Sequence, residues 1–255
     1  MKTINYYWRI LATGFCFATF GLGALFISLV IFPIQYLLYG KENRTKAARK
    51  VVIKTFYLFA RTMEIVGVLR IRVNGLKEIV DLKGAIIVAN HPSLIDVVVM
   101  IAYLPNTDCI IKSELFKNPF IKGVVSGVGY ISNDDPELII EDCKKSLASG
   151  YNIIIFPEGT RTVPGKSLKF RRGAANIAIR CQAHYLPVLI TVNPTTLTKN
   201  QPWYDVPPRK VEIELKVLPL MELTEYFEMP NVSLAARSLT STMQNYFTKE
   251  LAESG

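Results

Sequence analysis

The chain has 255 residues, half of them hydrophobic, and a formal net charge of +9. This length supports one substantial hydrophobic core in one or two domains. The positive charge suits an anionic partner, which could be a membrane surface, a phosphorylated substrate or a nucleic acid. Because the cations are dispersed and the chain starts with an apolar segment, we expect a membrane as partner and no nucleic acid.

The four cysteines are scattered along the sequence without Cys-x-x-Cys spacing. This pattern argues against a zinc site and against a thioredoxin-like motif. All four are expected to be free thiols in a reducing compartment: Cys16, Cys109, Cys143 and Cys181. No metal site is predicted, and no cofactor is expected.

The N-terminal segment has no charged residue from Ile10 to Tyr39. About 20 apolar residues are enough to cross a bilayer, so this segment is long enough to do so. A secretory signal peptide is the alternative, since Lys2 and Arg9 give a basic start, but the apolar run is too long and no small-x-small cleavage site ends it. We therefore predict a retained membrane anchor over residues 1–44.

The geometry of this anchor is open at the level of sequence. Gly21, Gly23 and Pro33 could interrupt the helix, so a tilted span and a helical hairpin in one leaflet are both compatible with the sequence. The residues after the anchor are far richer in cations than those before it, which places the remaining chain on the cytoplasmic side, at the inner membrane if the source is bacterial. These cations are Lys41, Arg44, Lys46, Arg49, Lys50 and Lys54.

Residues 45–70 alternate apolar and polar positions at helical spacing and predict an amphipathic helix. A short strand is expected at Ile71–Val73, followed by a turn at Asn74–Gly75. The packing of this helix on the core is the simpler expectation, with a membrane-surface helix as the alternative.

The next segment is an apolar strand, Ala85–Ala89, that runs directly into Asn90 and His91. Pro92 could occupy the first helical position, since its missing N–H is not needed there. This predicts a helix with Ser93 near its start and Asp96 one to two turns inside. Folded back over the first turn, the His91 ring could reach the Asp96 carboxylate, which would hold one ring nitrogen as N–H and leave the other free to accept a proton.

A second apolar strand, 151–156, ends in Pro157-Glu158-Gly159-Thr160-Arg161. Two strands that each end in polar residues indicate one site at the carboxyl edge of a sheet. An arginine suits bidentate recognition of an anion, and Gly159 permits a tight turn that exposes backbone N–H groups.

These two motifs together resemble those of the glycerolipid acyltransferases, the family of 1-acyl-sn-glycerol-3-phosphate acyltransferase. The first block of that family is a histidine and an aspartate separated by four residues, here His91 and Asp96. Its third block reads Phe-Pro-Glu-Gly-Thr-Arg, which residues 156–161 match throughout. His-x4-Asp alone is a weak signal, but both blocks in order, each after an apolar strand, are a strong one.

Three further stretches are similar to this family. Lys112 begins a stretch like the second block, which ends at Gly129-Tyr130-Ile131. An arginine that helps to hold the acceptor phosphate often follows there, but this chain has Ser132-Asn133-Asp134-Asp135 instead. Arg171 takes the place of a common lysine, and residues 186–192 resemble the fourth block.

The remaining elements complete an α/β pattern. Helices are expected from Asp135-Pro136 to about Ala148, over Ala174–Arg180 and over Ser233–Leu251, with an edge or half-exposed strand at Val211–Val217. Strands that alternate with helices predict a mixed sheet flanked by helices on both faces, preceded by the membrane-embedded helical segment. The catalytic domain is expected to cover residues 45–255.

The resemblance implies transfer of a fatty acyl group from acyl-CoA or acyl-carrier protein to the free hydroxyl of a lysophospholipid, with lysophosphatidic acid as the type acceptor. His91 is the expected general base, oriented by Asp96, with direct transfer and no acyl-enzyme. Ser93 lacks a Gly-x-Ser-x-Gly elbow and is not expected to carry the acyl group, and His184 is expected to be structural. Substrate binding is assigned to Glu158, Gly159, Thr160 and Arg161. Lys112 and Arg171 are further candidates that could steer the acyl donor, and a solvated basic face is an equally good interpretation of these two cations.

Two alternatives remain at this stage. The missing arginine leaves open a different lysolipid or a specialised lipid acceptor. A membrane protein that binds lipid without catalysis is the other alternative, and the intact His91 and Asp96 argue against it. For Glu158, contact with an acceptor hydroxyl and fixing of the turn are equally good readings.

Overall fold

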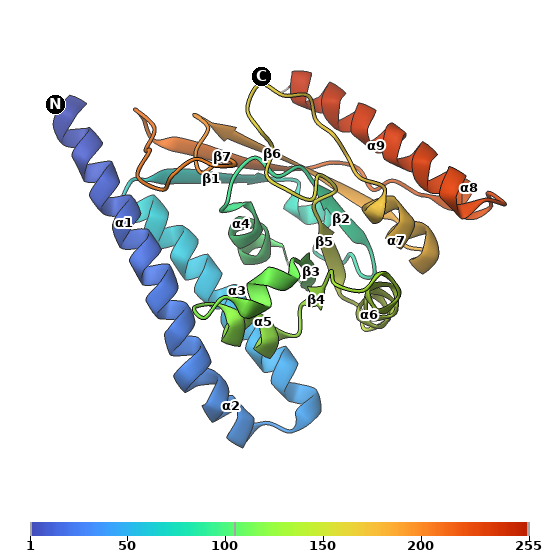
Figure 1. The fold of residues 1–255 in the computed structure, drawn as a ribbon, viewed down its shortest axis with the longest axis horizontal. Helices are drawn as coiled ribbons and strands as arrows, with labels where there is room; N and C mark the ends of the chain where they lie inside the picture. Colours follow the sequence, from blue (N-terminus) through green and yellow to red (C-terminus); the bar gives the residue numbers. More distant parts are fainter. Residues whose placement is uncertain (1, 105, 254–255) are drawn as a thin grey trace.

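The computed structural model describes residues 2–104 and 106–253, which form a mixed sheet between two layers of helices (Figure 1). The sheet has the strand order β1-β7-β6-β2-β5-β3-β4. All neighbouring pairs are parallel except β6 with β7, which is antiparallel. The strands are β1 (Leu69–Asn74), β2 (Ile86–Ala89), β3 (Thr107–Ile111), β4 (Ile131–Ser132), β5 (Asn152–Ile155), β6 (Tyr185–Asn193) and β7 (Val211–Val217).

The helices divide between the two faces of the sheet, as the sequence predicts. One face is covered by the N-terminal helices together with α4 and α5, and the other by α6, α7 and α9 (Figure 1). The helices are α1 (Lys2–Phe26), α2 (Phe32–Leu38), α3 (Lys41–Ile65), α4 (Asp96–Tyr103), α5 (Lys122–Val128), α6 (Pro136–Ala148), α7 (Gly173–Cys181), α8 (Thr224–Phe227) and α9 (Val232–Glu253). A π-helical turn (Ile27–Ile31) joins α1 to α2, and short 3-10 turns lie at Leu76–Glu78 and Ser113–Lys117.

The central strand β2 is buried on both faces, and its side chains alternate between the two cores. Ile87 and Ala89 pack into the core on the α4 side, while Ile86 and Val88 pack into the core on the α7 and α9 side. Such burial explains the continuous apolar run that identified this strand in the sequence. Because β6, β2, β5, β3 and β4 run in one direction, their carboxyl ends share one edge of the sheet.

The N-terminal helices form a hairpin with α3 and lie along the domain (Figure 1). Ile4–Leu38 is, within the described part of the chain, the one helical stretch long and apolar enough to cross a membrane. The π-helical turn precedes Pro33, which has no N–H to donate to the preceding turn. At this turn the hairpin meets α5: a Cβ added at Gly123 or Gly127 would overlap Ser28 or the Phe32 ring, respectively.

The amphipathic helix predicted over 45–70 is shifted towards the N-terminus. It begins at Lys41, where the Gly40 carbonyl accepts from the N–H groups of Asn43 and Arg44. It ends at Ile65 because Gly67 adopts a left-handed conformation with φ of +81°, a backbone that stops a helix at little cost. The following strand β1 is consequently longer than Ile71–Val73.

β7 is half-exposed, as one of the two expectations for it states, but it is not an edge strand. It lies between β1 and β6. The alternation of its side chains reflects two faces of unequal burial, with Val211, Ile213 and Leu215 buried. Side chains alternate with a period of two in edge strands and in inner strands alike, so this alternation cannot tell one from the other.

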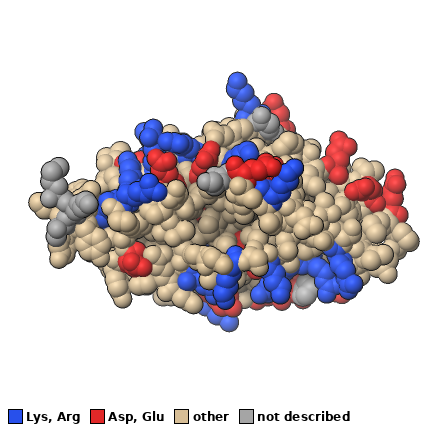
Figure 2. Space-filling model, turned by 90° about the horizontal axis from the view of Figure 1, so that it is seen from above, with Lys and Arg blue, Asp and Glu red and all other residues tan. Residues whose placement is uncertain are grey.

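The positive charge is not gathered in one place on the face shown in Figure 2. Lys and Arg side chains lie along both long edges of this face, with Asp and Glu among them. A broad band between the edges is largely uncharged. This arrangement differs from the continuous basic stripe that a nucleic acid backbone requires.

Candidate active site

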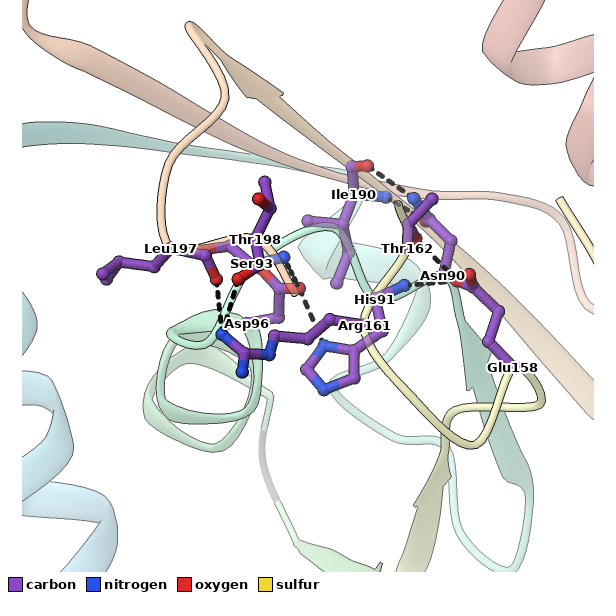
Figure 3. Close-up of polar contacts among 10 residues, drawn as sticks. All are labelled: Asn90, His91, Ser93, Asp96, Glu158, Arg161, Thr162, Ile190, Leu197 and Thr198. Atoms are coloured by element: carbon purple, nitrogen blue, oxygen red, sulfur yellow. Dashed lines mark hydrogen bonds and ion pairs between the residues drawn. The ribbon is translucent and has the colours of Figure 1, made fainter. Parts of the chain in front are cut away.

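His91 and Asp96 form the centre of the site at the carboxyl end of β2 (Figure 3). His91 Nδ1 lies 3.0 Å from Asp96 Oδ2. A carboxylate can only accept, so Nδ1 carries the proton of this hydrogen bond and Nε2 is the nitrogen that can take up another. The pair predicted from the sequence is therefore assembled in the structure.

The route by which the two side chains meet differs from the sequence prediction. Helix α4 begins at Asp96, so Pro92 and Ser93 lie in the turn before the helix and not in its first positions. The N–H of Ser93 donates to Asp96 Oδ2 at 2.7 Å, and the N–H of Leu94 donates to the Leu197 carbonyl at 3.1 Å. These two hydrogen bonds stabilise the non-helical turn. They outweigh the preference of proline for the first helical position.

Asp96 is fully buried, and burial raises the pKa of its carboxyl above 3.8. The hydrogen bond and charge of His91, the N–H of Ser93 and the charge of Arg161 act in the opposite direction. Oδ2 accepts both hydrogen bonds, whereas Oδ1 is buried with no partner among the described residues. A carboxylate held this way stabilises an imidazolium that forms beside it.

Residues of the turn after β5 form hydrogen bonds with both the N–H and the carbonyl of His91. Glu158 Oε1 accepts the His91 N–H at 2.9 Å, and the His91 carbonyl accepts the N–H of Thr162 at 2.7 Å. Thr162 Oγ1 also donates to Glu158 Oε1 at 2.9 Å. Burial raises the pKa of Glu158. The hydrogen bonds that it accepts from the His91 N–H and from Thr162 Oγ1 act in the opposite direction. This geometry favours the reading in which Glu158 fixes the turn.

The ring of His91 is also stacked on Phe156, the first residue of the same sequence block. Their ring centroids are 4.3 Å apart, and the ring planes differ by 29°. Asp96 fixes one edge of the imidazole and Phe156 covers one face of it. The sequence analysis included Phe156 in the block 156–161 but did not predict its contact with His91. The place of Phe156 at the start of that block was the available signal.

Arg161 lies beside this pair and is anchored by the β6–β7 connection (Figure 3). Its Nη1 donates to the carbonyls of Leu197 at 2.8 Å and Thr198 at 3.0 Å. The Leu197 carbonyl thus accepts from both Arg161 and Leu94, and it links the third sequence block to the turn after His91. Leu197 has a left-handed backbone, with φ of +51°. Nothing in the sequence pointed to this residue.

The other predicted binding residues lie at the same edge of the sheet but not all in contact with the pair. Arg171 crosses the turn after β5, since a Cβ on Gly159 would lie 3.3 Å from its Cδ and Nε. Thr160 is half-buried between Gly159 and Arg161. Lys112 is exposed and follows β3, which is separated from β2 by β5.

His184, the second histidine, has a structural environment. Its Nδ1 accepts the backbone N–H of Leu223 at 3.1 Å, and its ring lies 5.6 Å from that of Phe227. These contacts join the start of β6 to α8. The four cysteines are free thiols, three of them buried, and burial raises their pKa values.

Residues 70–191, which include the histidine–aspartate pair and the Glu-Gly-Thr-Arg turn at the carboxyl edge of the sheet, match the family model described as Acyltransferase. This match, together with relatives named as 1-acyl-sn-glycerol-3-phosphate acyltransferases, supports the O-acyltransferase activity that the two sequence blocks predict.

Two similar proteins are named as 1-acyl-sn-glycerol-3-phosphate acyltransferases. The chain is 28% identical over 183 residues to the 1-acyl-sn-glycerol-3-phosphate acyltransferase of Helicobacter pylori, covering 69% of this chain and 72% of the relative. It is 24% identical over 238 residues to the alpha form of that enzyme from Mus musculus, covering 91% and 79% of the two chains. The crystal structure of the Thermotoga maritima 1-acyl-sn-glycerophosphate acyltransferase shares the fold, with a TM-score of 0.68, 22% identity and coverage of 97% and 98%.

Proposed function

We propose that this chain transfers a fatty acyl group from acyl-CoA or acyl-carrier protein to the free hydroxyl of 1-acylglycerol-3-phosphate, at a membrane surface. The hydrogen bond of 3.0 Å between His91 and the buried Asp96 is the observation that carries this proposal. The names of the relatives give the substrate class. No cofactor takes part, and the thioester donor is a co-substrate.

In the proposed reaction, Nε2 of His91 takes the proton of the acceptor hydroxyl as its oxygen attacks the carbonyl carbon of the thioester. A base placed in this way accelerates a reaction by about 10² to 10⁴. The tetrahedral intermediate then collapses, the carbon–sulfur bond breaks, and the imidazolium gives its proton to the leaving thiolate. Asp96 stabilises the imidazolium during this sequence.

The anionic groups of the substrates are assigned to Arg161, Lys112 and Arg171. Arg161 uses Nη1 for the carbonyls of Leu197 and Thr198, and its remaining N–H groups are the ones we assign to a phosphate. Lys112 and Asn133 follow paired residues of the parallel strands β3 and β4, since Ile111 pairs with Ser132. Lys112 is therefore a cation next to the position where many family members have an arginine. Glu158, Gly159 and Thr160 shape the turn.

A different lysolipid acceptor is the second candidate function. Asp134 stands in the stretch where the family arginine is common, and Ser132 Oγ donates to its Oδ2 at 3.0 Å. The exposed Asp134 carboxylate is ionised at neutral pH, and hydrogen bonds from Ser113 and Ser132 lower its pKa further, so it repels a phosphate that binds beside it. This observation favours an acceptor with a different head group.

We also propose that the N-terminal helices bind one leaflet of the membrane without crossing it, which is the second of the two anchor geometries. Trp8 Nε1 donates to the Val66 carbonyl, and Phe32 packs on Gly127. At about 1.5 Å per residue, about 36 Å of helix separates these contacts, which exceeds the hydrocarbon thickness of about 30 Å. A helix that crossed the bilayer could not touch a domain in water at both places.

The face of α1 that points away from the domain supports a lipid environment. Only 11% of the most apolar window of Ile4–Leu38 is buried inside the molecule. Large exposed apolar side chains recur at spacings of three, four or seven residues along α1 and the π-helical turn; among them are Ile4, Leu11, Phe15, Leu22, Phe26 and Leu29. Insertion in the inner leaflet with residues 45–255 facing the cytoplasm agrees with the cations that follow the anchor.

The test is an assay of detergent-solubilised protein with a labelled long-chain acyl-CoA, and in parallel an acyl-carrier-protein donor, against lysophosphatidic acid and a panel of other lysolipids. We expect lysophosphatidic acid to be acylated and His91→Ala to lose about 10²-fold or more in kcat. His184→Ala is the matched control, since it removes the other histidine and should lower stability with kcat retained. Normal turnover by His91→Ala would refute the catalytic assignment, and acylation of only another lysolipid would establish the second candidate.

A further inference from the structure

The connection between β6 and β7 carries an unusual set of exposed side chains between residues 199 and 210. Trp203 is 43% exposed and Tyr204 is 56% exposed. Three cations flank them and are also exposed: Lys199, Arg209 and Lys210. We call residues 199–210 the aromatic loop.

The aromatic loop is fixed to the N-terminal helix α1 (Figure 1). The edge of the Trp203 ring lies 3.3 Å from the position of a Cβ on Gly14, and its centroid is 6.0 Å from that of Phe17. Arg9 Nη2 donates to the Pro208 carbonyl at 2.6 Å. The loop therefore sits beside the helix whose outer face exposes Leu11 and Phe15.

We propose that the aromatic loop is a second membrane-binding element and that its partner is a bilayer surface rich in anionic phospholipids. Tryptophan and tyrosine are the residues that settle at the level of the lipid head groups, because their rings have an apolar body and a polar edge. Cations beside them attract anionic head groups. The continuity of the loop with α1 selects a bilayer over a protein partner, and this inference rests on the proposed attachment of α1 to one leaflet.

The loop also gives this binding a consequence for catalysis. The carbonyls of Leu197 and Thr198, just before it, hold Arg161, and the Leu197 carbonyl holds the Leu94 N–H of the turn after His91. The aromatic loop begins directly after Leu197 and Thr198, so a bilayer bound by the loop lies near the site that receives the lipid acceptor. Docking of the loop places the head groups of membrane lipids close to Arg161.

Tryptophan fluorescence reports the position of the loop directly, because the chain has only two tryptophans. In a Trp8→Phe background, Trp203 is the single reporter. The vesicles contain phosphatidylcholine with about 30% phosphatidylglycerol as the anionic lipid. On their addition we expect a blue shift of the Trp203 emission, and quenching of this emission by a lipid labelled near the head group. Unchanged emission in vesicles that demonstrably bind the protein would overturn the proposal.

Cation substitutions test the choice of partner. With each cation near an anionic surface contributing about 1 kcal/mol, the triple variant Lys199→Ala, Arg209→Ala, Lys210→Ala should partition roughly 10²-fold more weakly into anionic vesicles. The matched control removes the same charge from the opposite face of the sheet, with Lys144→Ala, Arg180→Ala and Lys249→Ala. Equal losses in both variants would refute specific binding by the loop.

A vesicle-free assay with short-chain acyl-CoA and a short-chain lysophosphatidic acid separates this proposal from the proposed activity. The triple variant should retain wild-type turnover there and lose activity only on anionic vesicles. Loss of turnover in the vesicle-free assay would show that the cations serve the site and would overturn their role in docking. If the wild-type chain bound no vesicles at all, both this proposal and the membrane attachment of α1 would fail, whatever the result of the vesicle-free assay.

Discussion

The imidazole of His91 is stacked on the ring of Phe156, with 4.3 Å between the centroids and 29° between the planes. Asp96 holds Nδ1 of the same ring, so the imidazole is fixed in its plane and at its edge. A general base must be held in a productive orientation throughout the reaction, because small displacements of the base cost rate. We therefore propose Phe156 as a positioning residue for His91, the proposed general base.

Replacement of Phe156 by leucine should lower kcat about tenfold with little change in the KM of the donor. The leucine retains apolar contact but lacks the flat face, and a stacked aromatic pair contributes about 0.5–1.5 kcal/mol beyond burial. Steady-state kinetics over a range of pH would check this, since loss of orientation should also alter the pH profile of kcat. Phe156→Tyr keeps the ring and should retain most of the activity.

Phe247→Leu is the control for this experiment. Phe247 is fully buried and contacts Phe170 edge-on, with centroids 5.3 Å apart, on the opposite side of the sheet from His91. Its substitution should lower the unfolding temperature and leave the pH profile of kcat unchanged. An equal effect of both substitutions on kcat would argue against a specific role for Phe156.

Replacement of Asp96 by asparagine should separate stability from activity. The amide oxygen can accept the hydrogen bonds from His91 and Ser93, and the amide nitrogen takes the place of Oδ1, which has no partner in the described chain. Removal of the buried charge offsets the cost of the unpaired amide N–H groups, so stability at neutral pH should be equal or higher. Activity should fall by about 10²-fold or more, because an imidazolium beside a neutral amide is less stable.

The stability difference between Asp96→Asn and the wild type should depend on pH. Burial raises the pKa of Asp96 in the folded chain above 3.8, so the folded state binds this proton more tightly than the unfolded state. The carboxyl therefore costs stability as pH rises from about 4 through its raised pKa, and it costs nothing below that range. Thermal unfolding in detergent at a series of pH values should show the variant gaining on the wild type as pH increases. A constant difference would contradict this view of Asp96.

Local patterns in the sequence predicted the strands and the two motifs of the site well. The runs before His91 and Pro157 are buried on both faces of a parallel sheet, and this burial is what makes them continuous apolar runs. The start of α6 was also predictable, because Asp135 accepts the N–H groups of Glu137 and Leu138 as a side-chain cap.

The parts of the site that were not predicted depend on groups without a sequence signature. Every residue has a backbone carbonyl, so nothing singles out that of Leu197 as the acceptor for Arg161 and Leu94. The helix start at Asp96 was missed for a similar reason, since tertiary hydrogen bonds of Ser93 and Leu94 outweighed the local preference of Pro92.

Two substitutions of Glu158 should distinguish the two readings of this residue. In Glu158→Gln the amide oxygen still accepts from the His91 N–H and from Thr162 Oγ1, so stability and kcat should change little. Glu158→Ala leaves the N–H of His91 without this partner, which should cost about 1–3 kcal/mol of stability and lower kcat. Unfolding temperatures and kinetics of both variants give the answer. If Glu158 binds an acceptor hydroxyl instead, both variants should raise the KM of the acceptor without a change in unfolding temperature.

The contact between Gly127 and Phe32 should govern how firmly the N-terminal hairpin is held. A Cβ at position 127 would overlap the Phe32 ring, so Gly127→Ala should destabilise this contact by about 1–3 kcal/mol. Faster tryptic cleavage near Arg44, at the turn of the hairpin, would report the loosening. Gly21→Ala is the matched control, since nothing lies within 4 Å of its Cβ position on α1, and alanine there should be neutral or stabilising.

The double variant Gly127→Ala, Phe32→Ala makes the test specific. Removing the ring opens the space that the new methyl group needs, so the double variant should be destabilised by less than the sum of the two single variants. Tryptic half-lives of the four proteins, with and without vesicles, provide the cycle. Additive effects would mean that Gly127 and Phe32 do not press on each other and that the hairpin is held mainly by its other contacts, such as those of Trp8 and Arg9.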